Sequence, residues 1–123
     1  MDPARGASLW HDERVGLDAR ISIHSLPTGW SVAGELDAST SPSLSAAFAD
    51  LPAGPDRIEL DLGELTFIDS SGLRVLIALH DQVIADGRTL VVSSASNPVR
   101  RLLEITGLEA MFGLTGDSAP ANP

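Results

Sequence analysis

The chain has 123 residues and a net charge of −9, which indicates one acidic domain and disfavours direct binding to nucleic acid. Cysteine is absent, which excludes disulfides and thiolate chemistry, and the 4% aromatic content predicts an aliphatic core. Apolar runs stay short of the roughly 20 residues that span a bilayer, so we expect a cytoplasmic protein without membrane insertion.

The N-terminal part predicts an arm followed by a β-hairpin. Residues 1–16 are polar and aperiodic, and we expect them to form a flexible arm. Residues 17–25 alternate between apolar and polar side chains, which is typical of a half-buried strand. A turn containing Pro27 and Gly29 leads to a second strand over residues 30–36.

A helix and a third strand come next. Ser41 is a good N-cap and Pro42 suits the first helical position, where a missing N–H costs nothing. The apolar spacing that follows is helical and is expected to end at Pro52. Alternation returns over residues 57–65 and predicts a strand.

The remaining sequence predicts further alternation of helices and strands. In chain order we expect a helix at 70–86 ended by Gly87, a strand at 89–94, a helix from its cap Asn97 to Gly107, and a short strand within 108–115. Residues 116–123 are polar and proline-rich and are expected to form a flexible tail. The order predicts an α/β domain with a mixed sheet, an N-terminal hairpin before parallel strands, and helices packed against it.

The stretch Glu64–His80, ELTFIDSSGLRVLIALH, joins a strand to a helix. Phe67 is expected within the end of the buried strand, and residues 69–72 at the start of the helix. That position is the carboxyl edge of the sheet, where function concentrates in α/β folds, and the helix N-terminus carries partial positive charge. A structural interpretation is also open: a serine that only caps the helix, and Gly72 placed for close packing.

A second polar junction, AGELDASTSP at residues 33–42, also lies between a strand and a helix. If the two strands are neighbours, both junctions form one acidic, hydroxyl-rich patch. The positions of the three histidines, His11, His24 and His80, do not predict that any of them acts as a base for a serine nucleophile. Without a glycine-rich phosphate loop, a tight acid cluster or cysteine, the sequence indicates no catalytic residue, metal or cofactor.

Three stretches in order carry a family resemblance: GELDAST, LTFIDSSGLRVLI and NPVRRLLEITGLEAMF. They resemble the STAS-domain family, and within it the bacterial anti-sigma factor antagonists. The likeness covers residues 17–115. It implies a protein-interaction module, not an enzyme.

The resemblance also implies a mechanism of partner switching. Such antagonists bind an anti-sigma factor that is itself a GHKL-type serine kinase, and binding frees the sigma factor. The kinase phosphorylates a serine, and a PP2C-type phosphatase reverses the reaction. The acceptor position maps to Ser70, with Ser71 as the alternative. The expected partner-binding residues are Asp37, Ser39, Thr40, Asp69, Ser70, Ser71, Gly72 and Arg74, of which Arg74 replaces a small residue found in many relatives.

Two other hypotheses stay open. The chain could be a non-phosphorylated STAS subunit that docks on a transporter ATPase or on a stressosome-like scaffold. An enzyme is the third class, and the missing constellation of acid, base and nucleophile counts against it. A monomer or a weak homodimer is expected.

Overall fold

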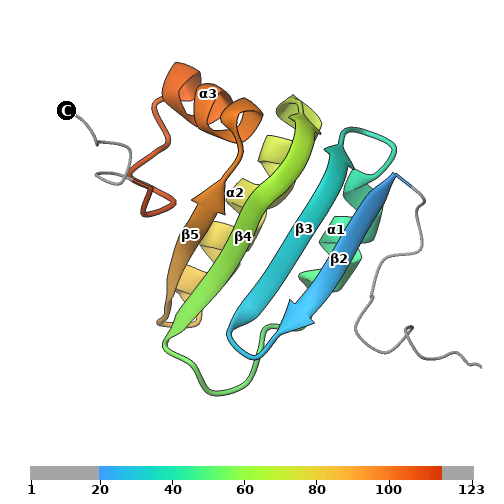
Figure 1. The fold of residues 1–123 in the computed structure, drawn as a ribbon. Coiled ribbons are helices and arrows are strands. Elements are labelled where there is room, and N and C mark those ends of the chain that lie inside the picture. Colours follow the sequence, from blue (N-terminus) through green and yellow to red (C-terminus); the bar gives the residue numbers. More distant parts are fainter. Residues whose placement is uncertain (1–19, 115–123) are drawn as a thin grey trace, which may run out of the picture.

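The computed structural model describes residues 20–114, and this part of the chain forms a four-stranded sheet with three helices. The elements are β2 (Ile21–Leu26), β3 (Gly29–Leu36), α1 (Ser41–Ala47), β4 (Arg57–Ile68), α2 (Ser70–Ala85), β5 (Thr89–Ala95) and α3 (Asn97–Thr106). The strands lie in the order β2-β3-β4-β5 (Figure 1). The β2–β3 pair is antiparallel and the other two pairs are parallel, so the predicted mixed sheet is confirmed.

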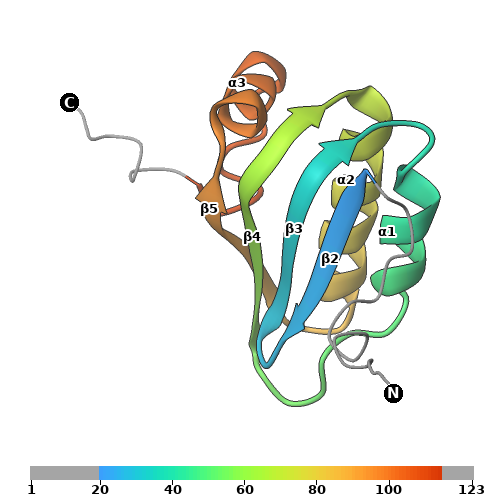
Figure 2. The same cartoon turned by 45° about the vertical axis from the view of Figure 1, so that its right-hand side comes forward.

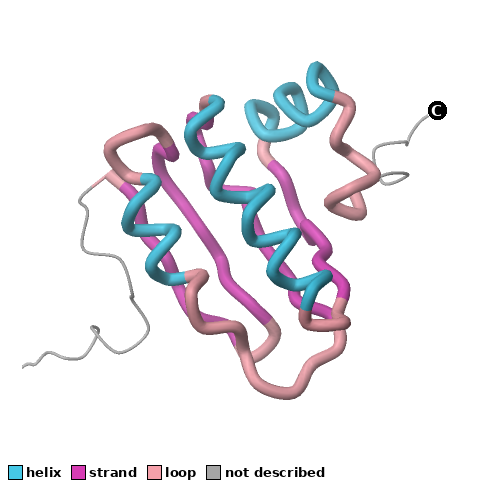
Figure 3. The backbone as a smooth tube through the Cα atoms, turned by 180° about the vertical axis from the view of Figure 1, so that it is seen from behind, coloured by secondary structure: helices cyan, strands magenta, loops and turns pink. Residues whose placement is uncertain are grey.

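The helices are arranged unevenly around the sheet. Figure 3 looks at the face that α1 and α2 cover, where the two helices run side by side along the strands. Figures 1 and 2 show that no helix of the described part covers the opposite face, and that α3 lies beyond the carboxyl end of β5. Helix α3 contacts β4 as well as β5.

Apolar side chains that alternate along the strands point toward α1 and α2 and form the core. Each such side chain, once fully buried, contributes about 1.5–3 kcal/mol. The core is mainly aliphatic, as the composition predicts, although Trp30 and Phe48 pack with ring centroids 4.7 Å apart. Fully buried aliphatic members include Ile21, Ile23, Val32, Leu36, Leu44, Ile58, Leu60, Leu62, Leu76 and Val83.

Strand β4 changes its side-chain pattern near its end. The register with β3 is irregular between Ser31 and Ala33 and again between Gly34 and Glu35. Beyond these irregularities the inward positions of β4 are spaced by three residues, as from Leu65 to Ile68, instead of two. The expectation that Phe67 is buried is therefore wrong: its side chain is 47% exposed.

The N-caps of α1 and α3 each lie one residue before the position that the sequence predicts. The N-cap of α1 is Thr40, because Ser41 is already helical and its hydroxyl donates to the carbonyl oxygen of Asp37 at 2.6 Å. The N-cap of α3 is Ser96, so the expected cap Asn97 is the first helical residue. Proline in the first turn tolerates either register, which is why the sequence did not separate them.

Helix α1 ends at Ala47, well before the predicted stop at Pro52. The guanidinium of Arg88 donates to the carbonyl oxygens of Pro52 at 2.6 Å and Pro55 at 3.1 Å. These long-range bonds hold the connection before β4 in place, and a proline also disfavours helix at the residue before it.

The short strand expected within 108–115 does not form over the described residues 108–114, which make turns. The N–H groups of Phe112, Gly113 and Leu114 donate to carbonyl groups only three to five residues earlier. The Phe112 ring is fully buried and meets the edge of the His80 ring at a centroid distance of 5.9 Å. Burial of this ring explains the apolar pattern of residues 108–114. An alternation of apolar residues cannot by itself distinguish a buried turn from a strand. The predicted arm and the tail 116–123 lie outside the described residues.

Candidate functional site

The two polar junctions lie side by side at one edge of the sheet. Strands β3 and β4 are parallel neighbours, and their last residues, Leu36 and Ile68, are Cα partners. The N–H of Asp69 donates to the carbonyl oxygen of Leu36 at 3.2 Å, which joins one junction to the other. The predicted adjacency is confirmed. We call the surface formed by residues 37–41 and 69–74 the junction surface.

Asp69 is the N-cap of α2. Its backbone is extended, and its Oδ1 accepts hydrogen bonds from the N–H groups of Ser71 at 2.9 Å and Gly72 at 3.2 Å. The interpretation in which a serine caps this helix is wrong, because the carboxylate of Asp69 already satisfies the exposed N–H groups.

The two adjacent serines therefore differ in their surroundings. Ser70 is the first residue of α2 and is exposed. Its hydroxyl makes no hydrogen bond within residues 20–114. Ser71 is half-buried and lines a groove between α1 and α2. The serine with the more accessible hydroxyl is Ser70.

Gly72 holds the start of α2 against the end of β3. A Cβ at this position would lie 2.5 Å from Cγ of Leu36 and 3.0 Å from the carbonyl oxygen of Leu36. The close-packing interpretation of this glycine agrees with the structure. Gly72 is buried, so its role at the junction surface is to allow close packing of α2 on β3, and it offers no side chain to a partner.

The β3–α1 junction is organised around Asp37. Oδ1 of this carboxylate accepts from the N–H and hydroxyl of Ser39 at 2.9 and 3.0 Å, and from the N–H of Thr40 at 3.1 Å. The hydroxyl of Thr40 donates to the carbonyl oxygen of Glu35 at 2.8 Å. Thr40 is fully buried, so it braces the loop, whereas Ser39 is exposed.

Arg20 is a contributor that the sequence did not reveal. Its two terminal nitrogens bind both carboxylate oxygens of Asp37, at 2.8 and 3.2 Å, and one also binds Glu35 at 3.3 Å. The guanidinium, ahead of the hydrogen bonds from Ser39 and Thr40, lowers the pKa of Asp37 from 3.8 to about 2. Asp37 thus presents a fixed negative charge at any physiological pH. Local sequence spacing does not predict a contact between residues 17 positions apart.

A groove of about 380 Å³ runs beside the serines, between α1 and α2. Its walls are built mainly from small side chains, with Arg74 as the charged member. The lining residues are Ala38, Ser41, Pro42, Ser45, Ser71, Arg74, Val75 and Ala78. Small residues on the facing sides of two helices were the available sequence signal for this groove.

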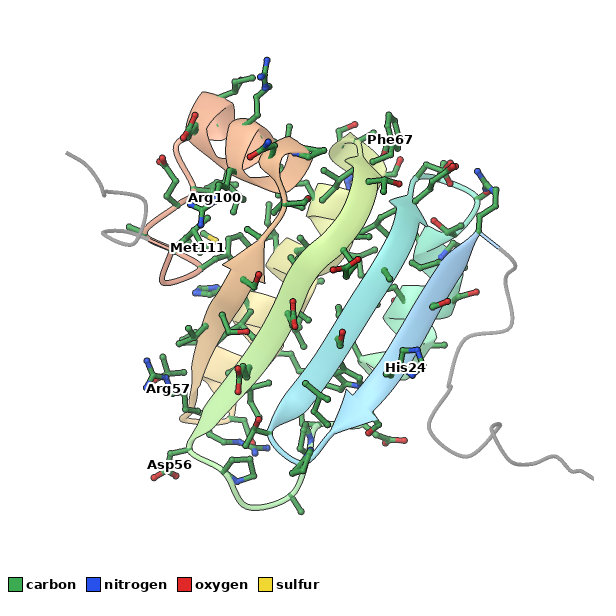
Figure 4. All side chains as sticks on the ribbon, viewed as in Figure 1. His24, Asp56, Arg57, Phe67, Arg100 and Met111 are labelled. Carbon is green, nitrogen blue, oxygen red and sulfur yellow. The ribbon has the colours of Figure 1, made fainter. Side chains whose placement is uncertain are left out.

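Phe67 adds an exposed apolar side chain near the junction surface. It lies at the carboxyl end of β4, where Figure 4 labels it, and its Cα partner on β3 is Glu35. A single exposed apolar side chain is common on folded proteins, so Phe67 alone does not identify an interaction surface.

The described residues offer little support for catalysis. His24 is exposed within β2, and His80 lies ten residues beyond Ser70 on α2, roughly 15 Å along the helix. Neither is placed to take a proton from Ser70. Over residues 20–114 there is no group of three metal-ligating side chains, and no helix that is long and apolar enough to cross a membrane.

A larger pocket of about 620 Å³ lies away from the junction surface. Thr28, Arg57 and Glu59 contribute to it near the start of β4, and Gly113 is also among its lining residues. The hydroxyl of Thr28 already donates to Glu59 at 3.0 Å. This pocket does not bring together any of the predicted site residues.

Comparison with known proteins identifies the class. A family model described as "Mlab, STAS domain" matches residues 20–115, and the chain belongs to the STAS domain family. Its relatives include the anti-sigma-B factor antagonist of Bacillus subtilis (strain 168), 28% identical over 87 residues that cover 71% of this chain and 80% of that protein.

Two further similarities point the same way. The anti-sigma-B factor antagonist of Listeria monocytogenes is 35% identical over 78 residues, which cover 63% of this chain and 68% of that protein. The crystal structure of an anti-sigma factor antagonist from Mycobacterium paratuberculosis has a TM-score of 0.65 at 26% identity, covering 79% of this chain and 86% of that one. The relatives named here are antagonists, a regulatory class and not an enzymatic one.

Proposed function

We propose that this chain is an anti-sigma factor antagonist whose binding to its anti-sigma factor is switched off by phosphorylation of Ser70. The observation that carries the proposal is the exposed Ser70 hydroxyl at the first position of α2, free of hydrogen bonds within residues 20–114. Its relatives include antagonists from Bacillus, Listeria and Mycobacterium, which supports the role.

The partner proposed here is an anti-sigma factor that is itself a GHKL-type serine kinase. It contacts the exposed part of the junction surface, including Asp37, Ser39 and Ser70, and the groove lined by Ser71 and Arg74. The buried residues Thr40 and Gly72 keep that surface in shape. A PP2C-type phosphatase restores the binding-competent form. The chain performs no catalysis of its own.

Phosphorylation would act on the interface and leave the fold intact. A phosphate adds about −1.5 to −2 charges at pH 7. The N-terminus of α2 has no acidic residue in its first turn and attracts negative charge, so the helix tolerates the phosphate. A partner surface matched to a neutral hydroxyl meets repulsion and a desolvation penalty instead. A change of about 3 kcal/mol would lower affinity more than a hundredfold.

The test is affinity capture from a lysate of the native host, followed by identification of the captured proteins by mass spectrometry. Wild type is compared with Ser70→Asp and with Ser93→Asp, a matched control at an exposed serine of β5. Wild type and Ser93→Asp are expected to retain a small GHKL-type kinase, and Ser70→Asp to lose it.

A different outcome would favour the second candidate. The matching family model carries the description "Mlab, STAS domain" and not that of an antagonist, which keeps the non-phosphorylated subunit open. If all three forms retain the same transporter ATPase or scaffold protein, the switch at Ser70 is excluded and this candidate replaces it.

A further inference from the structure

Arg74 occupies a distinctive position relative to Ser70. It lies on α2 four residues after that serine, and its side chain is exposed. Within residues 20–114 its guanidinium makes no hydrogen bond and no ion pair. Arg20 and Arg88, in contrast, bind carboxylates or carbonyl oxygens of the fold. Among the described residues, the charge of Arg74 therefore has no partner in the unmodified protein.

Helix geometry brings Arg74 toward the first turn of α2. Side chains four positions apart on a helix are neighbours, with Cβ atoms about 5–6 Å apart. Long helical side chains also lean toward the N-terminus, so the guanidinium of Arg74 can extend over Ser70. The planar guanidinium matches two phosphate oxygens at once and forms short, charge-assisted hydrogen bonds with them.

The other charged groups at this junction are already engaged. The Asp69 carboxylate accepts from two N–H groups of its own helix, and Arg20 binds Asp37 and Glu35. A phosphate on Ser70 adds negative charge beside Asp69, and Arg74 is the cation on the same helical face that can compensate for it.

We propose that the guanidinium of Arg74 binds the phosphate once Ser70 is phosphorylated, and that this contact withdraws Arg74 from the groove between α1 and α2. The inference rests on the proposed function, because it concerns the modified state of the same serine. Arg74 lines the groove together with Ser71 and Val75. In the unmodified protein its charge is available there to an acidic group of the partner, and in the phosphorylated protein it is not.

The consequence is a switch with two linked effects. Phosphate places negative charge on the junction surface, and the same event removes positive charge from the neighbouring groove. An anti-sigma factor that presents a carboxylate to Arg74 would lose an attractive contact at the moment when it meets a repulsive one. Arg74 acts here as a positioning residue for the phosphate and as a specificity residue for the partner.

The test uses full-length protein that carries phosphoserine at position 70, installed during translation, so that no cellular kinase is needed. A ³¹P NMR titration measures the second pKa of the phosphate, which is ordinarily near 6. A cation beside the phosphate favours the dianion and lowers this pKa. Arg74→Ala should raise the phosphate pKa by roughly 0.3 pH unit or more at low salt, and Arg74→Lys should give an intermediate value.

The matched control is Arg57→Ala, which removes the same net charge at the opposite end of β4. Figure 4 labels Arg57 there, and a strand of 12 residues separates it from the junction by roughly 40 Å. Charges this far apart are largely screened by salt. Arg57→Ala should therefore change the phosphate pKa by less than about 0.1 pH unit. The Arg74 Nε–H resonance should also shift when unmodified and phosphorylated protein are compared.

Two results would overturn the inference. One is a phosphate pKa that is the same with Arg74 and with Arg74→Ala, and the other is an equal effect of Arg57→Ala, which would make the effect one of net charge. Neither result depends on whether a host kinase modifies Ser70, because the phosphate is installed directly. Failure of the lysate capture would count against the proposed function and leave this titration to be judged separately.

Discussion

Two aspartates define the chemistry of the junction surface at the scale of single residues. Asp69 satisfies the exposed N–H groups of α2, and Asp37 organises the loop before α1. Because Asp69 performs the capping, the hydroxyl of Ser70 is left exposed to solvent. Asp69 therefore has the structural role of a cap, and the proposed phosphorylation concerns the serine next to it.

Removal of the Asp69 cap should destabilise the protein. We expect Asp69→Ala to lower the free energy of unfolding by about 1 kcal/mol, because two N–H groups lose their acceptor. Asp69→Asn keeps an oxygen acceptor and should recover most of that loss. Urea unfolding measures both variants, and a stability of Asp69→Ala equal to that of wild type would show that the Asp69 cap does not stabilise the protein.

The Asp37–Arg20 contact predicts a pH dependence. The pKa of folded Asp37 is about 2, below the ordinary value of 3.8, because the Arg20 guanidinium stabilises the carboxylate. The contribution of this group to stability is fully present above about pH 4 and is lost as the pH falls toward 2. Arg20→Ala should raise the Asp37 pKa toward 3.8, as followed by the side-chain carboxyl ¹³C shift. An unchanged pKa in that variant would remove Arg20 as the cause.

At the scale of elements, the seating of α2 on β3 depends on Gly72. An alanine here would gain about 1 kcal/mol of helix propensity, yet its Cβ would clash with Leu36 at 2.5 Å and with a backbone oxygen at 3.0 Å. We expect the clash to dominate, so Gly72→Ala should cost about 1–2 kcal/mol of unfolding free energy in urea.

A double-mutant cycle separates packing from propensity at this contact. In a Leu36→Ala background the clashing side-chain atoms are gone, and Gly72→Ala should then cost much less than in wild type. The same cost in both backgrounds would mean that Leu36 is not the obstacle.

Elements set by local pattern were predictable from the sequence. Alternating apolar side chains located the strands, and the helical spacing together with Gly107 located α3 and its left-handed end. The errors came from tertiary contacts that a local pattern does not contain. Register irregularities against β3 turned Phe67 outward, and burial of the Phe112 ring explained an apolar stretch that resembled a strand.

The candidate site was also predicted only in part, because some of its features depend on local pattern and others on tertiary contacts. Polar residues after two strands indicated adjacent junctions, because parallel neighbours end at one sheet edge. The salt bridge from Arg20 and the groove between α1 and α2 depend on how distant segments pack. Sequence spacing alone could not distinguish the capping Asp69 from a capping serine, since both side chains suit an N-cap.

At the scale of the whole molecule, the proposed switch should leave the fold unchanged. We expect the unfolding free energy of Ser70→Asp to stay within about 0.5 kcal/mol of wild type, because the residue is exposed at a helix N-terminus. Leu79→Ala, in the core, should cost about 2–5 kcal/mol and calibrates the measurement. A loss for Ser70→Asp as large as that of Leu79→Ala would mean that the charge unfolds the domain.

The most direct measurement of the central claim is site-resolved phosphorylation. Wild type, Ser70→Ala and Ser71→Ala are incubated with ATP in an extract of the native host, and phosphopeptides are mapped by tandem mass spectrometry. We expect phosphate on Ser70 in wild type and in Ser71→Ala, and none at this junction in Ser70→Ala. Phosphate that persists at the same level in Ser70→Ala, or its absence from Ser70 in wild type, would exclude Ser70 as the phosphorylated residue.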